Sequence, residues 1–270
     1  MPTTVRSTSR YGWIPDLPDV RDHMFAAPMA ALGRLPASVD LRAQCPATVY
    51  DQGRIGSCTA NAIAGAFEFE LIKGKLADFM PSRLFIYYNE RSIEGHVQTD
   101  SGAMIRDGIK VVASLGVCSE TMWPYDDTPP ATAGGVWPAG AAAGEKPPPT
   151  AYTAATRSEA LAYQRIVQNL AQFKGCLASG YPFVLGFTVY DSFESPQVAA
   201  TGVVPMPTSA EAAIGGHAVL AVGYDDATSR FLVRNSWGAG WGMGGYFTMP
   251  YAYVSDTGLA RDFWTIRTVS

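Results

Sequence analysis

The sequence predicts an α+β protein in which a helical half precedes a mainly antiparallel β half. Between residues 58 and 116 the apolar residues recur at helical spacing, whereas after Gly180 short β-rich runs alternate with Gly and Asp turns. Helices grouped before strands are typical of this fold class. The 270 residues are 47% hydrophobic and 16% charged, which allows a sizeable core and one large domain, or two small ones around a cleft.

The first predicted helix begins at Cys58 and stops at Gly74. Its apolar residues follow one stripe and its other side is small, which indicates a buried central helix. Two more helices are expected over residues 81–93 and 102–116, followed by a long Pro/Ala/Gly-rich connection over 128–156. Ser158 is expected to cap a fourth helix. The apolar face of that helix would be Tyr163, Ile166, Val167, Leu170 and Phe173.

Five β-rich runs make up the second half of the chain. They are bounded by Gly and Asp turns, as strands of an antiparallel sheet usually are. The expected strands cover residues 183–190, 217–224, 230–237, 244–251 and 263–269.

Composition excludes several function classes. The net charge of −4 and the pI of about 5.4 do not fit a nucleic-acid binder, and no run approaches the ~18 apolar residues of a membrane span. The four cysteines contain no Cys-x-x-Cys pair, which argues against a zinc site, and we expect no metal or cofactor. Cys45 and Cys118 remain candidates for a disulfide, whereas Cys176 is expected to be buried and free. We expect a monomer.

The N-terminus has no apolar signal core. The sequence therefore predicts a cytoplasmic protein or one secreted by a non-standard route, unless a signal had been removed.

Cys58 stands where a glycine-rich turn gives way to a helix. A thiol attacks as its thiolate, and free N–H groups at a helix N-terminus lower the pKa of a thiol. The position therefore suits a nucleophile. A buried structural cysteine is the alternative, and the helix pattern alone does not decide between the two.

A nucleophile needs a base, and the chain has only three histidines. His217 alone begins a predicted strand beside two glycines that leave space in front of the ring. Asn235 follows one hairpin later and is suited to orient the imidazole, with Trp237 able to cover their hydrogen bond. The alternatives are a packed histidine and a turn asparagine.

Three stretches, "DQG…GSC", "GGHAVLAVGY" and "RNSWGAGWGMGGYF", resemble the signatures of the papain-like cysteine peptidases. The similarity runs from about Leu35 to Ile266. It implies a two-lobed fold with a helical lobe over about 50–127, an antiparallel β-barrel-like lobe over about 157–270, and the active-site cleft between them. Residues 36–270 would form the peptidase domain. Ile55 replaces a cysteine usual in the family, which suggests a divergent, bacterial branch.

The resemblance also implies a role for each catalytic residue. Cys58 would be the nucleophile, and Gln52 would share the oxyanion hole with the Cys58 N–H. His217 would be the acid and base, and Asn235 would hold its ring. The implied activity is that of a cysteine endopeptidase acting on protein or peptide substrates through a thioester.

A glycine-rich edge is similar to the one that binds the substrate backbone in this family. A neighbouring pocket would take P2, the second residue upstream of the cut. The implied substrate-binding residues are Ser101, Gly102, Ala103, Met104, Ile105, Gly186, Gly216, Trp237 and Asp262. Asp262 at the pocket floor would favour Arg or Lys beside large apolar residues. The alternative is an aspartate that bonds to backbone at a strand start.

Residues 1–35 form an N-terminal arm with bulky residues spaced by prolines. Extended Pro-rich peptides lie easily in grooves, so we predict that the arm packs over the cleft and inhibits the enzyme intramolecularly. A disordered leader is the alternative.

Two other functions remain compatible with this resemblance. One is a papain-fold amidase or acyltransferase with non-peptide substrates, and the other is a binding module with an inert cleft. The four intact catalytic residues argue against the binding module.

Overall fold

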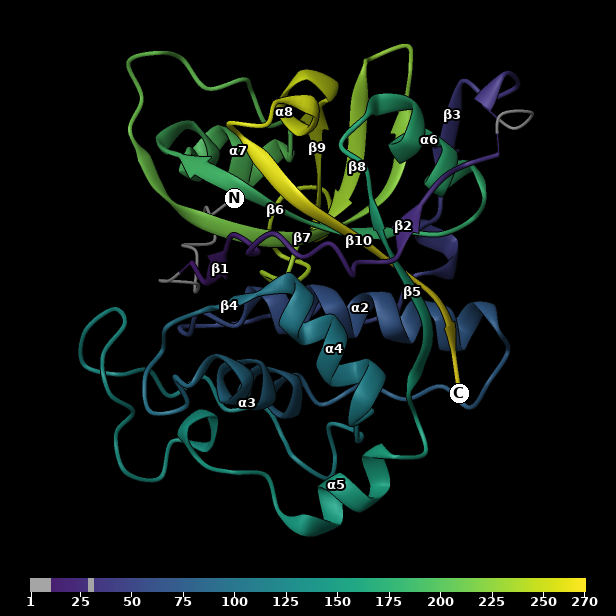
Figure 1. The fold of residues 1–270 in the computed structure, drawn as a ribbon. Coiled ribbons are helices and arrows are strands. Elements are labelled where there is room, and N and C mark those ends of the chain that lie inside the picture. The colour runs from purple at the N-terminus through teal and green to yellow at the C-terminus, as the bar shows by residue number, and fades with distance from the viewer. Residues whose placement is uncertain (1–10, 29–31) are drawn as a thin grey trace.

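The helices of residues 58–155 and the large sheet occupy opposite halves of the molecule in a computed structural model that describes residues 11–28 and 32–270 (Figure 1). The lower half holds four helices among the described residues, α2 (Cys58–Lys73), α3 (Arg83–Glu94), α4 (Ile105–Ser114) and α5 (Pro149–Ala155). The upper half holds the sheet and the short helices α6 (Leu170–Ala178), α7 (Pro196–Thr201) and α8 (Tyr251–Ser255). The α+β class predicted from the sequence is confirmed.

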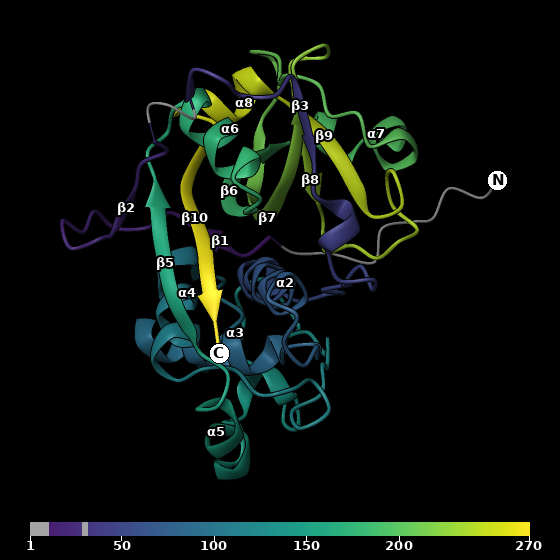
Figure 2. The same ribbon diagram turned by 90° about the vertical axis from the view of Figure 1, so that its right-hand side faces the viewer.

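The sheet has the strand order β2-β5-β10-β6-β7-β8-β9, and β3 pairs with β7. Its pairs are antiparallel except β2 with β5. β5 and β10 run side by side from the upper half down toward the helices (Figure 2). The strands are β2 (Met24–Phe25), β3 (Ser38–Asp40), β5 (Ala160–Ile166), β6 (Phe183–Tyr190), β7 (Ala213–Asp225), β8 (Arg230–Arg234), β9 (Tyr246–Pro250) and β10 (Ala260–Val269).

Helix α2 is the central element that joins the two halves. It contacts α3 and α4 below and β7 and β10 above, and every residue from Cys58 to Leu71 is buried. Small residues on α2 allow the helix to approach β7 closely. A Cβ atom added to Gly65 would lie only 3.6 Å from the Leu220 side chain. Gly74 ends the helix as predicted, with its N–H bonded to the Glu70 carbonyl. The nucleophile candidate is therefore mounted on a rigid helix.

The prediction of a helix starting at Ser158 is wrong. Residues 160–166 form β5, which pairs with β10 and with the arm, and the helix α6 starts only at Leu170. The Asn169 side chain accepts from the N–H groups of Ala171 and Gln172 and so caps that helix. The connection over 128–156 is also more ordered than expected, because α5 and a short 3-10 turn (Ala142–Gly144) lie in it.

The five predicted strands are all present as β6 to β10. The four cysteines, Cys45, Cys58, Cys118 and Cys176, are free and buried, so Cys45 and Cys118 do not form the disulfide that was considered. Within residues 11–28 and 32–270, no helix combines the length and the apolar character needed to cross a membrane.

The N-terminal arm runs between the two halves (Figure 1, Figure 2). Its strand β1 (Trp13–Ile14) pairs in parallel with β4 (Ala103–Met104), the short strand before α4, and β2 joins the edge of the sheet at β5. Residues 1–10 of the predicted arm lie outside the described residues. Residues 29–31 lie outside them too. Residues 11–28 run mainly in extended conformation and cross the boundary where the predicted catalytic residues meet.

Candidate active site

Cys58 and His217 come from different halves of the molecule and meet where α2 packs on β7. Cys58 is the first residue of α2, and its Sγ accepts a hydrogen bond from the N–H of Ala218 at 3.4 Å. Ala218 directly follows His217 in β7, and both His217 and Cys58 are fully buried. The helix N-terminus therefore presents the thiol to the strand that carries the only histidine predicted to act as a base.

Asn235 fixes the orientation of the imidazole. Its Oδ1 lies 2.8 Å from Nε2 of His217 and also accepts from the N–H of Ser236 at 2.9 Å. Because the backbone bond identifies Oδ1 as the acceptor, Nε2 must carry the ring proton. In the neutral ring, Nδ1 is then the nitrogen that can accept a proton.

Aromatic rings enclose this pair. Trp237 stacks on the His217 ring with a centroid distance of 5.1 Å and an interplanar angle of 29°. Phe187 contacts the same ring edge-on at 5.7 Å, and Tyr11 of the arm does so at 5.8 Å. Hydrogen bonds are stronger where water is excluded, so these rings strengthen the His217–Asn235 bond.

Gln52 is fully buried beside Asn235. Its Oε1 accepts from the Ser236 hydroxyl at 2.8 Å, and its Nε2 donates to the carbonyl of Ile55 at 3.1 Å. These two bonds identify the amide nitrogen and hold it toward the turn that leads to Cys58. The structure thus brings together all four residues that the sequence analysis chose as catalytic.

The predicted low pKa of the thiol is not found in this arm-covered structure. Burial raises the pKa of Cys58 to about 12, although the N–H groups of Ala218, Gly12 and Thr59 oppose the rise. Gly12 belongs to the arm, so the arm itself lies against the thiol. The expectation considered only the helix N-terminus, and desolvation outweighs it here.

A carboxyl group lies beneath the predicted nucleophile. Thr59, the next residue in α2, donates from its hydroxyl to Glu90 Oε2 at 2.9 Å. Burial raises the pKa of Glu90 well above its ordinary value, because this side chain on α3 is fully enclosed. Desolvation thus disfavours a negative charge on Glu90, and any charge that it carries raises the pKa of the Cys58 thiol further.

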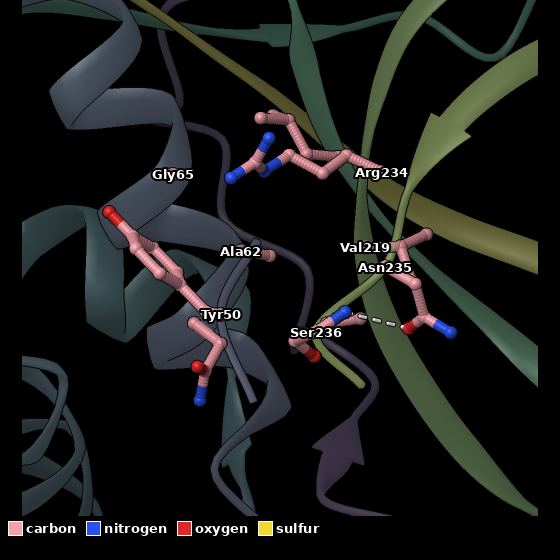
Figure 3. Close-up of a pocket in the computed structure, with 10 residues that line it drawn as sticks. Tyr50, Ala62, Gly65, Val219, Arg234, Asn235 and Ser236 are labelled. Atoms are coloured by element: carbon pink, nitrogen blue, oxygen red, sulfur yellow. Dashed lines mark hydrogen bonds between the residues drawn. The ribbon is translucent and has the colours of Figure 1, made fainter. Parts of the chain in front are cut away.

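A small cavity lies behind the predicted catalytic residues, between α2 and β7 (Figure 3). Tyr50, Gly65, Arg234, Asn235 and Ser236 line it, and the Ser236 bond to Asn235 crosses its edge. Its volume of about 10 Å³ has room for roughly one water molecule. A substrate therefore does not bind there.

The arm occupies the part of the cleft predicted to bind substrate. The Gly12 carbonyl accepts from the Ala103 N–H at 2.7 Å, and Gly102 lies against the same residue. The Trp13 indole fills the space beside Gly186 and Gly216, where an added Cβ on either glycine would collide with it. The predicted glycine-rich edge and the predicted pocket thus both contact the arm.

Asp262 lies at the end of this pocket with a positive φ of 59°. It accepts from the N–H of Asp16 at 2.8 Å and pairs with Arg165 at 2.9 Å. Its carboxylate thus accepts a backbone N–H, as the alternative interpretation expected, but that N–H belongs to the arm and the charge is paired with an arginine.

The remaining predicted binding residues have less direct positions. Ser101 donates from its hydroxyl to the Gly102 carbonyl, Met104 pairs with Ile14 of the arm, and Ile105 is fully buried at the start of α4. Trp237 covers the His217 ring.

Comparisons with known proteins agree with this geometry. Residues 35–265 match the family described as papain family cysteine protease. The chain belongs to the papain family of cysteine proteases.

Relatives in this family differ widely in source. A peptidase C1-like protein of Acanthamoeba polyphaga mimivirus is 40% identical over 96% of this chain and 87% of its own. Cathepsin K of Gallus gallus is 30% identical over 84% of this chain and 63% of its own. Among solved structures, xylellain, a cysteine protease from Xylella fastidiosa, is 52% identical, covers 98% of both chains and has a TM-score of 0.93. The procathepsin L 3 of Tenebrio molitor, at 20% identity, covers 90% of this chain and 73% of its own with a TM-score of 0.68, and shows the fold alone.

Sequence reasoning missed a group of charged residues at the far end of this papain-family cleft. Asp16 and Asp22 of the arm meet Arg106 of α4, Arg165 of β5 and the indole of Trp264 on β10. The acidic spacing in "PDLPDVRD" was a signal for the arm half of this group. No comparable sequence signal pointed to Arg106 and Arg165, because these residues are far apart in the chain.

Proposed function

We propose that this papain-family protease is a cysteine endopeptidase in which Cys58 is the nucleophile and His217 the general acid and base. The observation that carries the proposal is the contact between α2 and β7. It holds the thiol 3.4 Å from the Ala218 N–H, next to an imidazole whose other nitrogen is bound to Asn235.

The groups define the reaction sequence. The thiol gives its proton to Nδ1 of His217, and Sγ attacks the carbonyl carbon of the scissile peptide bond. The C–N bond breaks as the imidazolium gives that proton to the leaving amine. Water, activated by the neutral ring, then hydrolyses the thioester and regenerates the thiol. Asn235 keeps the ring in the required tautomer throughout.

Gln52 and the Cys58 N–H form the proposed oxyanion hole. Donors aimed at the developing charge accelerate acyl transfer because they need no rearrangement during the reaction. The bonds of Gln52 to Ile55 and Ser236 supply that fixed orientation.

The arm is the proposed intramolecular inhibitor. Gly12 lies against the thiol, Trp13 fills the pocket and the Ala103 N–H is bonded to the arm. A substrate needs the same three features, so binding of the arm and of the substrate exclude each other. Protein or peptide substrates then require release of the arm.

A variant of the nucleophile tests the proposal. The arm is first weakened by Trp13→Ala in the full chain, and hydrolysis of a fluorogenic Phe-Arg peptide is measured under reducing conditions. Adding Cys58→Ala should lower kcat by about 10⁴-fold or more. Cys45→Ala, which removes another buried thiol away from the site, should leave activity unchanged. Equal activity with and without Cys58 contradicts the assignment. Silence toward every peptide, with Cys58 still alkylated by iodoacetamide, shifts the substrate class to non-peptide amides.

We also propose that the pocket prefers large apolar P2 residues, because an indole fills it. The predicted preference for Arg or Lys depends on Asp262, whose charge is already paired with Arg165. In the Trp13→Ala background, Phe-Arg peptides should react faster than Arg-Arg peptides. Arg165→Ala should free the Asp262 carboxylate and raise the relative rate of Arg-Arg, whereas Arg157→Ala, on an exposed surface, should not. If the ratio of Arg-Arg to Phe-Arg hydrolysis is the same in Trp13→Ala with and without Asp262→Ala, Asp262 gives no preference for basic P2 residues.

A further inference from the structure

The far end of the cleft holds two carboxylates of the arm in a positively charged site. Asp22 accepts from the guanidinium of Arg106 at 2.9 and 2.7 Å and from Arg165 at 2.9 Å. Asp16 accepts from the Trp264 indole N–H at 2.8 Å and from the Arg106 backbone N–H at 3.0 Å. We call Arg106, Arg165 and Trp264 the acid socket.

The acid socket is built into the rigid part of the enzyme. Arg106 lies in the first turn of α4, where backbone N–H groups face a bound anion. Trp264 is in β10 and is 1% exposed, and Arg106 is 4% exposed beneath the arm. Asp22 takes the ion pairs with Arg106 and Arg165, whereas Asp16 accepts from the Trp264 indole and a backbone N–H, so the site offers both positive charge and directed donors.

Release of the arm leaves the acid socket with an excess of positive charge. Arg165 keeps its ion pair with Asp262, which belongs to the sheet. The side-chain hydrogen bonds of Arg106, by contrast, all go to the arm, to Asp22 and to the Leu17 carbonyl. A guanidinium in this position then requires a new anionic partner or hydration.

The position of the acid socket indicates what that partner is. Along the arm, Gly12 lies at Cys58, Trp13 fills the proposed P2 pocket, and Asp16 lies beyond it, farther from the nucleophile. A substrate whose P2 residue replaces Trp13 places its next upstream residues in the same direction. Its P3 to P5 side chains therefore come within reach of Arg106.

We propose that the acid socket is a specificity site of the peptidase, which binds an Asp or Glu side chain of the substrate upstream of P2. The inference rests on the proposed function, because it assumes that peptides replace the arm. In this arrangement Asp16 and Asp22 occupy the site that the acidic substrate side chain takes after release.

The test uses the full chain with an unlatched arm, Trp13→Ala, Asp16→Ala and Asp22→Ala together. Its substrates are acetylated fluorogenic peptides with Phe-Arg at P2–P1 and Glu or Gln at P3, P4 or P5. At one of these positions Glu should raise kcat/KM by about tenfold over Gln, mainly through KM, as one charge-assisted hydrogen bond allows. Higher ionic strength should reduce the difference.

Arg106 is the residue on which this discrimination should depend. Adding Arg106→Gln should bring the Glu-to-Gln ratio of kcat/KM close to one. Arg106→Lys keeps the charge but cannot form the bidentate hydrogen bonds, so it should retain part of the discrimination between Glu and Gln peptides. The matched control Arg157→Gln, on an exposed part of the helical half, should leave the ratio unchanged. A thermal melt of each variant checks the fold.

Two outcomes overturn the proposal and separate it from the proposed function. Cys58-dependent hydrolysis with a Glu-to-Gln ratio of one at P3, P4 and P5 shows that the acid socket serves only the arm. If no peptide is hydrolysed, the proposed function fails instead. Fluorescence anisotropy of the same peptides on the unlatched Cys58→Ala variant then tests the acid socket alone, and equal Kd values for Glu and Gln peptides overturn it.

Discussion

The two ends of the cleft are held together by different kinds of interaction. At the proposed catalytic end, neutral hydrogen bonds hold His217 to Asn235, Gln52 to Ser236 and the Cys58 thiol to the Ala218 N–H, and rings such as Trp237 enclose them. At the arm end, aspartates of the arm meet arginines of the enzyme, with Asp262 adding a further charge. Only the second end depends on the ionisation of carboxylates.

This difference fits the proposed function, in which the catalytic residues keep one arrangement and the arm is released. Buried neutral hydrogen bonds need no counterion and are costly to break, so they keep one geometry. Ion pairs between an arm and a groove bring a smaller net stabilisation, because water solvates both partners after release. In the proposed function, the cleft thus combines a fixed catalytic end with an arm that changes of pH or ionic strength displace.

The catalytic end is tested most strongly through Gln52. In the Trp13→Ala background, Gln52→Ala should lower kcat by about 10²–10³-fold, because one oxyanion donor is lost. The surface variant Gln197→Ala on α7 provides the matched control and should have no effect. Steady-state kinetics with the Phe-Arg peptide measure both, and an unchanged kcat for Gln52→Ala would remove this residue from the oxyanion hole.

The link between the two ends is tested through Trp13. This side chain is 8% exposed, and its truncation should cost arm docking about 3 kcal/mol, or roughly a hundredfold in the docking equilibrium. Peptidase activity of the full chain and the rate of Cys58 alkylation by iodoacetamide should both rise. Leu17→Ala, which truncates an arm residue that is 67% exposed, should change neither. Equal activities of wild type and Trp13→Ala would show that the arm does not restrain the enzyme.

The arm end should also respond to pH. Burial and the nearby charge of Asp262 raise the pKa of Asp16 from 3.8 to about 6. The docked arm therefore takes up a proton as the pH falls through 6, so docking should weaken by up to about a hundredfold as the pH rises from 4 to above 6. Burial alone would raise the pKa of Asp22, but bonds from Arg106 and Arg165 lower it, and that opposite contribution is lost only below about pH 4.

The ratio of wild-type to Trp13→Ala activity measures this response, because the pH dependence of catalysis cancels. The ratio should rise between pH 5 and pH 7, and Asp16→Asn should flatten it. Asp19→Asn, at an arm carboxylate paired only with Arg21, should not. A wild-type ratio that stays flat or falls between pH 5 and pH 7 would show that ionisation of Asp16 does not weaken arm docking.

Sequence reasoning succeeded where local signals are strong. The helix from Cys58, the strand at His217 and the turn after Asn235 each carry their own pattern of small, apolar and turn residues, and a family resemblance joins them. It failed over residues 158–170, because β5 exists only through its pairing with β10, about a hundred residues away. A helical spacing of apolar residues there had no local signal against it.

The charged end of the cleft lay beyond sequence reasoning for the same reason. Asp22, Arg106, Arg165 and Trp264 come from the arm, α4, β5 and β10, and no local pattern links them. The pKa of Cys58 was missed for another reason. The expectation considered only the helix N-terminus and left out the desolvation of the thiol, although the arm itself was predicted to pack over the cleft.

Gly186 and Gly216 lie on the paired strands β6 and β7 and leave space for the Trp13 side chain. A Cβ at either position would fill that space. In the proposed function, the inhibitory arm and the substrate insert a side chain into this same space. Any substitution that narrows it weakens self-restraint and substrate choice together, so neither trait can drift alone. In each chain, the arm therefore binds in the pocket before any substrate does, and its docking depends on the same pocket shape.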